Sequence, residues 1–116
     1  MSDQQVRSAA VVLADRFYLS EESRAELSRL GGFAFAEAKS DQDLAERIGG
    51  SSAVKVIVSE YVPVNEVVLG KAPALKGVIA YGAGYDHIDV RALKRRGVKA
   101  CNCRGENAQA VAELVF

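Results

Sequence analysis

The feature that most constrains the fold of this chain is a regular alternation of short apolar runs with polar, helix-forming segments. The apolar runs lie at residues 9–14, 33–36, 54–58, 78–80 and 98–101, and each has the length of a buried strand. Because the runs are apolar at successive positions, both faces of each strand are expected to be covered. The pattern therefore predicts an α/β domain, an open sandwich with a five-stranded parallel sheet and helices on both faces.

The segments between these runs carry helix start and stop signals. The first two begin at Ser20 and Ser40 and each ends at a glycine pair, as expected of an N-cap and a C-terminal stop. Residues 64–69 are predicted to form a short helix or turn, and Asp89 is predicted to open a further helix. No linker or change in composition interrupts the chain, so residues 1–116 are predicted to form a single domain.

Charge and hydropathy exclude several classes of partner. Fifteen basic residues balance fifteen acidic ones, which gives a formal net charge of zero, so no overall field favours nucleic acid or an anionic membrane. The apolar run before Asp15 is too short for a signal peptide or a membrane span. We therefore expect a cytoplasmic protein with neither a nucleic-acid nor a membrane partner.

The cysteines point to no special chemistry. Cys101 and Cys103 are two residues apart on a predicted strand, so their side chains share one face and do not form the turn of a Cys-x-x-Cys pair. No histidine is near them in sequence. They are interpreted as buried free thiols, and no metal site is predicted.

A glycine-rich loop follows the fourth predicted strand. Gly82-Ala83-Gly84 begins like a dinucleotide-binding fingerprint, but it lacks the third glycine and the acidic residue at the end of the next strand. Two glycines at the carboxyl end of a parallel strand let successive N–H groups point outward, where they attract a carboxylate. A tight turn that binds nothing is equally compatible with the residues alone.

Longer motifs surround this loop. The string Gly-Ala-Gly-Tyr-Asp-His-Ile-Asp at 82–89 is followed by Arg-Arg-Gly-Val-Lys at 95–99 and Val-Ala-Glu at 111–113. Together with the order of elements, these strings resemble the substrate-binding domain of the D-isomer-specific 2-hydroxyacid dehydrogenases. The resemblance implies a flavodoxin-like fold and a parent enzyme that transfers hydride between NAD or NADP and C2 of a 2-hydroxy or 2-oxo acid.

The resemblance also implies roles for individual residues. Backbone amides of Ala83 and Gly84 would hold the substrate carboxylate, with Gly82 shaping the turn, and Ala83 would also approach the nicotinamide. Ser59, after the third strand, would line the same pocket, and Asn107 would face the cleft that holds the cofactor. The expected ligand is a small 2-hydroxy or 2-oxo acid, bound weakly.

No catalytic residue is expected within the chain. In the family, the acid/base histidine, its acidic partner and the substrate-binding arginine belong to the nucleotide-binding domain, so His87 is interpreted as a residue that precedes a helix. The apolar helix predicted at 107–116 has no stop signal, which indicates a truncation at the start of the interdomain helix. The chain is therefore expected to bind no cofactor and to be inactive alone. Its exposed apolar surface could be covered by a homodimer through residues 108–116 or by a swapped element.

Three other classes of protein share parts of this pattern. A receiver module requires an acidic pair after the first strand and a phosphoacceptor aspartate after the third, whereas this chain has Asp15 alone and Ser59-Glu60. An FMN-binding flavodoxin requires a Ser/Thr-rich phosphate loop after the first strand, and none is present. A non-catalytic unit that simply folds alone is fully compatible with the sequence.

Overall fold

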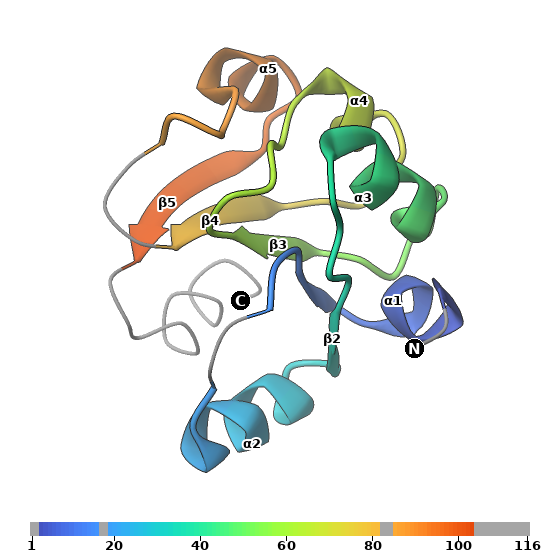
Figure 1. The fold of residues 1–116 in the computed structure, drawn as a ribbon, viewed down its shortest axis with the longest axis vertical. Coiled ribbons are helices and arrows are strands. Elements are labelled where there is room, and N and C mark those ends of the chain that lie inside the picture. Colours follow the sequence, from blue (N-terminus) through green and yellow to red (C-terminus); the bar gives the residue numbers. More distant parts are fainter. Residues whose placement is uncertain (1–2, 17–18, 82–84, 104–116) are drawn as a thin grey trace.

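The sheet has the architecture predicted from the sequence. The computed structural model describes residues 3–16, 19–81 and 85–103. Its five strands are all parallel, in the order β2-β1-β3-β4-β5 (Figure 1). Their bounds are Val11–Leu13 (β1), Phe33–Phe35 (β2), Val56–Ser59 (β3), Gly77–Tyr81 (β4) and Lys99–Cys103 (β5). The α/β class and the five-stranded parallel sheet are therefore confirmed.

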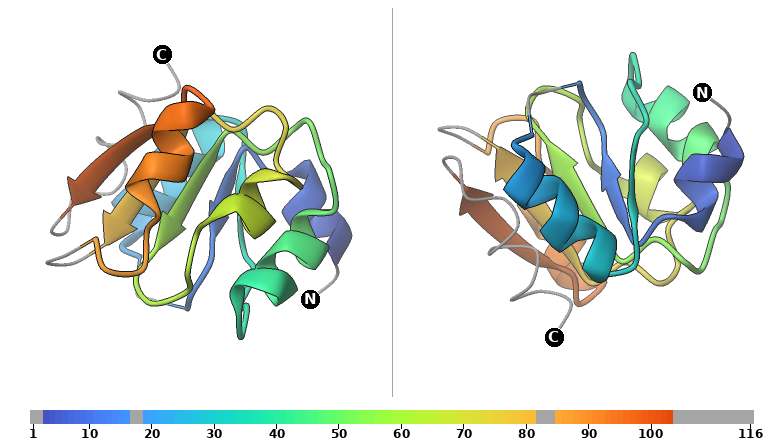
Figure 2. Two further views of the ribbon diagram at one scale, coloured as in Figure 1. Left: turned by 90° about the horizontal axis from the view of Figure 1, so that it is seen from above. Right: turned by 90° about the horizontal axis from the view of Figure 1, so that it is seen from below.

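Helices cover both faces of this sheet unequally. One face carries four of the described helices, and the opposite face carries α2 (Figure 2). The four are α1 (Asp3–Ser8), α3 (Asp41–Ile48), α4 (Glu66–Leu69) and α5 (Val90–Arg95), and α2 spans Glu21–Arg29. Consecutive helices on the first face pack against one another, α1 on α3, α3 on α4 and α4 on α5.

Two apolar clusters fill the space between the sheet and its helices. The larger lies under the four helices and includes Val6, Ile48 and Leu93. The smaller lies under α2, around Leu27 and Ile79. At its margin several side chains stay half-buried, namely Leu30, Phe33, Phe35, Tyr81 and Cys101. The sequence analysis predicted that Cys101 is a buried free thiol. Its thiol is free, but the residue is only half-buried.

Side-chain caps start the helices where the sequence predicted them. Ser20 Oγ accepts a hydrogen bond from the N–H of Ser23, and Ser40 Oγ accepts one from the N–H of Asp43. The carboxylate of Asp89 accepts from Ala92 N at 3.0 Å and so caps α5. Each cap satisfies one of the N–H groups that a helix N-terminus leaves without an intrahelical partner.

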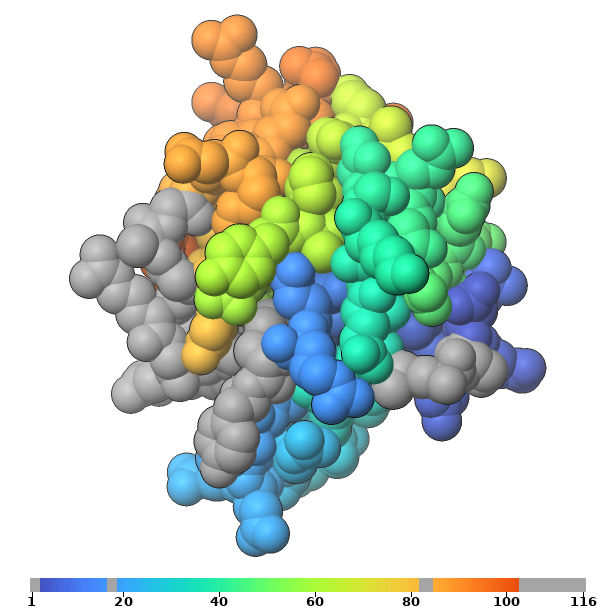
Figure 3. Space-filling view, viewed as in Figure 1, coloured from blue at the N-terminus to red at the C-terminus, as the bar shows by residue number. Residues whose placement is uncertain are grey.

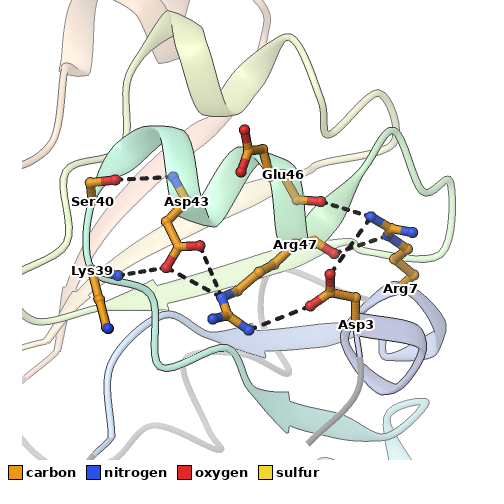
Figure 4. A network of polar contacts seen from close by, with 7 residues as sticks. All are labelled: Asp3, Arg7, Lys39, Ser40, Asp43, Glu46 and Arg47. Atoms are coloured by element: carbon orange, nitrogen blue, oxygen red, sulfur yellow. Dashed lines mark hydrogen bonds and ion pairs between the residues drawn. The ribbon is translucent and has the colours of Figure 1, made fainter.

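Helix α1 was not predicted, because it is short and mostly polar. Of its six residues, only Val6 is buried. Charged groups fasten it to α3: Arg7 donates to the backbone carbonyls of Glu46 and Arg47, and Arg47 lies 3.4 Å from Asp3 (Figure 4). These contacts join residues about 40 positions apart, which explains why local sequence gave no signal for this helix.

Two adjacent glycines after α2 give a matched pair of substitutions. Both have positive φ, 118° at Gly31 and 89° at Gly32, but a Cβ at Gly31 would lie 2.7 Å from Ala10 Cβ, whereas none lies within 4 Å at Gly32. Gly31→Ala is expected to lower the free energy of unfolding by about 1–3 kcal/mol, and Gly32→Ala by less, because only the first adds a clash to the backbone strain. Urea unfolding of both variants tests this, and equal losses would show that the contact with Ala10 is irrelevant.

The carboxyl of Asp43 makes stability depend on acid pH. The backbone N–H of Lys39 donates to it at 2.9 Å and Arg47 lies within 3.3 Å, and both contacts lower the pKa of Asp43. A carboxyl whose pKa is lower in the folded state stabilises the fold above its unfolded pKa, and this contribution is lost as the pH falls through the folded pKa. We therefore expect Asp43→Asn to cost about 1 kcal/mol at pH 7 and clearly less near pH 3. Urea unfolding at both pH values measures this, and a pH-independent difference would contradict it.

Candidate functional site

The segments that follow β1, β3 and β4 come together at one edge of the sheet. Leu13 is paired with Val58, and Ser59 is paired with Ala80, so these three strands end at similar heights. In open parallel α/β sheets, ligands bind outside the carboxyl ends of the strands. The described residues at this edge therefore define the candidate site.

A carboxylate occupies the centre of this edge. Oδ2 of Asp15 accepts hydrogen bonds from Glu60 N at 2.6 Å and Tyr61 N at 3.2 Å, and Oδ1 accepts one from Val62 N at 3.2 Å. Three consecutive N–H groups thus converge on one anion, which is the geometry of a backbone anion nest. Asp15, from the end of β1, fills this nest and fixes the loop after β3.

Ser59 contributes to the same loop. It is fully buried, and its hydroxyl donates to the carbonyl of Val62 at 2.6 Å and lies 3.4 Å from Asp15 Oδ2. The structure therefore places Ser59 at the predicted edge, with its hydroxyl hydrogen bonded inside the loop. Its role in lining a substrate pocket stays a prediction.

Hydrogen bonds connect residues 85–89 to the loop after β3. Nε2 of His87 lies 2.9 Å from the carbonyl oxygen of Ser59, and because a carbonyl only accepts, Nε2 must carry the hydrogen. Val64 N donates to His87 O, and Asp89 N donates to Val64 O, both at 2.9 Å. His87 therefore joins the loops after β3 and β4, and Asp89 caps the helix that follows.

The glycine-loop and cleft residues predicted as ligand contacts lie outside the described residues. These are Gly82, Ala83, Gly84 and Asn107, together with the predicted helix at 107–116. Asp15 is the residue that sequence analysis missed. An acidic residue directly after a fully apolar strand is visible in the sequence. Its hydrogen-bond partners are not, because they are 45 to 47 positions away.

Arg16, the basic residue next to Asp15, already pairs with a carboxylate. Arg16 donates to both carboxylate oxygens of Glu37, at 3.1 and 3.4 Å, and its guanidinium lies 5.9 Å from the ring centroid of Phe35. The hydrogen bond and charge of Arg16 lower the pKa of Glu37. The positive charge at this edge is thus balanced by a neighbouring carboxylate.

Other features of the described residues do not indicate a different position for this site. A groove of about 410 Å³ lies among Gln5, Ser8, Arg24 and residues 31–35, mostly at the amino ends of β1 and β2. No group of three His, Cys, Asp or Glu side chains among the described residues is placed to hold a metal ion. Within 3–16, 19–81 and 85–103, no helix has the length and apolarity that crossing a bilayer requires.

Comparison with known proteins shows the family of this chain. The sequence model of the D-isomer specific 2-hydroxyacid dehydrogenase catalytic domain matches residues 11–116. This chain therefore belongs to the D-isomer-specific 2-hydroxyacid dehydrogenase family and corresponds to part of its catalytic, substrate-binding domain.

Individual relatives agree with this assignment. Erythronate-4-phosphate dehydrogenase of Idiomarina loihiensis is 38% identical over 66 residues, 57% of this chain and 17% of that protein. Glyoxylate reductase of Thermococcus litoralis is 33% identical over 73 residues, 63% of this chain and 22% of that protein. The chain thus spans about a fifth of the length of these curated relatives.

Solved structures support the fold. The NAD⁺-bound 3-phosphoglycerate dehydrogenase of Entamoeba histolytica superposes with a TM-score of 0.68 at 25% identity, over 92% of this chain and 36% of that one. D-mandelate dehydrogenase of Rhodotorula graminis, in its apo form, superposes with a TM-score of 0.62 at 25% identity, over 92% of this chain and 34% of that one.

Proposed function

We propose that this chain is the substrate-binding part of an NAD(P)-dependent oxidoreductase that acts on a small 2-hydroxy or 2-oxo acid. The family match over residues 11–116 supports this class of reaction. In the whole enzyme, hydride would pass between the nicotinamide and C2 of the substrate, while this domain holds the substrate's carboxylate.

The occupied nest at the end of β3 limits where the substrate carboxylate can bind. The N–H groups of Glu60, Tyr61 and Val62 already donate to Asp15, so they are not free for a substrate carboxylate. The remaining strand end at the centre of this edge is that of β4, which leads into Gly82-Ala83-Gly84. As the family resemblance implies, we assign the carboxylate contact to the amides of Ala83 and Gly84, with Gly82 shaping the turn.

The remaining roles are proposals of the same kind. NAD or NADP belongs to the whole enzyme, with Ala83 and Asn107 facing it, and no catalytic residue is assigned within residues 1–116. We propose that these residues form a single domain and that 107–116 begin the helix that leads to the nucleotide-binding domain. A homodimer through residues 108–116 and a cytoplasmic location stay predictions from the sequence.

Ligand-observed NMR tests this function directly. Saturation transfer from the protein to glyoxylate is expected, and oxamate, an isostere of a 2-oxo acid, is expected to compete with it. Acetate at the same concentration should compete less, because it lacks the 2-oxo group. The chain alone should not oxidise NADH in the presence of glyoxylate. Absence of saturation transfer, or equal competition by acetate, would contradict the proposed function.

A further inference from the structure

A groove lies along β2, the first strand in the order of the sheet. Strand β2 lies between α1 and α2 (Figure 1), and in the space-filling view both helices reach the surface, α1 in dark blue at the right and α2 in light blue at the bottom (Figure 3). Residues of α1, α2 and β2 line the groove, which has a volume of about 410 Å³. Sites for small molecules have volumes of roughly 300–1,000 Å³, so the groove is large enough for such a ligand.

The lining of the groove is mostly apolar. Phe33 and Phe35 contribute two aromatic rings that meet edge to face, with centroids 6.2 Å apart, and both side chains are only half-buried. Ala9 and Ala34 add apolar surface. An apolar group that packs on these rings would remove more of their surface from water, which is favourable. The groove therefore fits a ligand with an apolar or aromatic body.

Arg24 supplies the charge of this groove. Its guanidinium carbon lies 5.8 Å from the ring centroid of Phe33, and its Nε donates to the carbonyl of Leu19 at 3.4 Å. In the described part of the chain, every arginine except Arg24 and Arg91 forms an ion pair with a carboxylate. The terminal amino groups of Arg24 are thus left for a ligand, and arginine binds a carboxylate well because its planar fork can donate two parallel hydrogen bonds.

The segments that precede the strands add positive charge at the same end of the sheet. These segments, 8–10, 30–32, 49–55, 70–76 and 96–98, contain no aspartate or glutamate. They do contain Lys55, Lys71 and Lys76. Because unbalanced charges of one sign raise the local concentration of the opposite ion, this end of the sheet favours an anionic ligand.

We propose that the groove along β2 is a second binding site, which takes a small carboxylate with an apolar or aromatic body. Arg24 binds the carboxylate, and the half-buried rings of Phe33 and Phe35 contact the body. This site is separate from the proposed substrate site, because the groove lies mostly at the amino ends of β1 and β2 whereas Ser59 lies at the carboxyl end of β3.

Amide NMR titration of the labelled chain with 3-phenylpropionate tests this inference, at an ionic strength held constant with chloride. Selective shifts are expected at the amides of Gly32, Phe33 and Ala34. Two further ligands separate the contributions of charge and apolar body: 3-phenylpropionamide keeps the ring without the charge, and acetate keeps the charge without the ring. Both should bind more weakly than 3-phenylpropionate, by about twofold to fivefold for the amide, the range that one exposed ion pair gives.

Two arginine variants make the test specific to the groove. Arg24→Gln should weaken the binding of 3-phenylpropionate about twofold to fivefold and leave the affinity for the amide unchanged. Arg91→Gln removes the other described arginine without an ion pair, on α5, and should change neither affinity. The side chains of both arginines are exposed, so both variants should keep the dispersed spectrum of the wild type.

Three results would overturn this inference: shifts at residues 82–84 in place of 32–34, equal affinities for the acid and its amide, or equal losses in the two variants. The proposed function is tested separately, because glyoxylate lacks an apolar body. Titration of Arg24→Gln with glyoxylate should therefore give the same shifts as titration of the wild type.

Discussion

Replacing Asp15 by alanine is expected to lower the free energy of unfolding by about 2–4 kcal/mol. The wild-type carboxylate accepts three backbone hydrogen bonds, at 2.6, 3.2 and 3.2 Å. Its removal leaves those N–H groups without an acceptor, including that of Val62, a residue that is 6% exposed. Hydrogen bonds to a charged group contribute more than neutral ones, and buried donors without partners carry the cost of desolvation. Urea unfolding at pH 7 measures the loss.

The same variant allows chemical rescue. With the Asp15 side chain gone, the N–H groups of Glu60, Tyr61 and Val62 form an empty anion nest, which acetate or formate can fill. Either anion is expected to restore part of the lost stability of Asp15→Ala and to leave the wild type unchanged, with chloride as the ionic-strength control. A loss below about 0.5 kcal/mol, or no difference between acetate and chloride, would show that the carboxylate does not hold this loop.

Replacing Ile57 by alanine is expected to lower the free energy of unfolding by about 2–5 kcal/mol. Ile57 lies in β3, the central strand, is 0% exposed, and is paired with Val12 on one side and Val78 on the other. Truncation removes buried methyl and methylene groups and leaves a cavity that the neighbouring strands cannot close.

A smaller change at this position provides the matched control. Ile57→Val removes one methylene group and should cost about 0.5–1.5 kcal/mol. Denaturant unfolding followed by circular dichroism measures both variants. An alanine variant within about 1 kcal/mol of the wild type would show that Ile57 is not in a closely packed core.

The fold could be predicted because its signals are local. Ser20, Ser40 and Asp89 each accept a hydrogen bond from a residue three positions on, and such spacings can be read directly from the sequence. Strands buried on both faces are equally visible as continuous apolar runs. Helix α1 has neither signal. It is held instead by contacts of Arg7 and Arg47 with distant parts of the chain.

The site could be predicted only in part, because most of its contacts join residues that are far apart in the sequence. Parallel strand order brings Ser59 to the edge at which β4 ends, as expected. The sequence did not show that Asp15 fills the nest after β3, nor that His87 contacts the carbonyl of Ser59, because these contacts depend on strand order and register. The strand pattern and the family resemblance therefore identified the edge but not the hydrogen bonds that organise it.

A two-dimensional amide NMR titration of the labelled chain with glyoxylate tests the central claim most directly, with chloride as the ionic-strength control. We predict selective shifts at Gly82, Ala83 and Gly84, while the amides of Glu60 and Val62, which are bonded to Asp15, change little. Shifts confined to residues 60–62, or a dispersed spectrum that glyoxylate leaves unchanged, would contradict the assignment of the substrate carboxylate to the loop after β4.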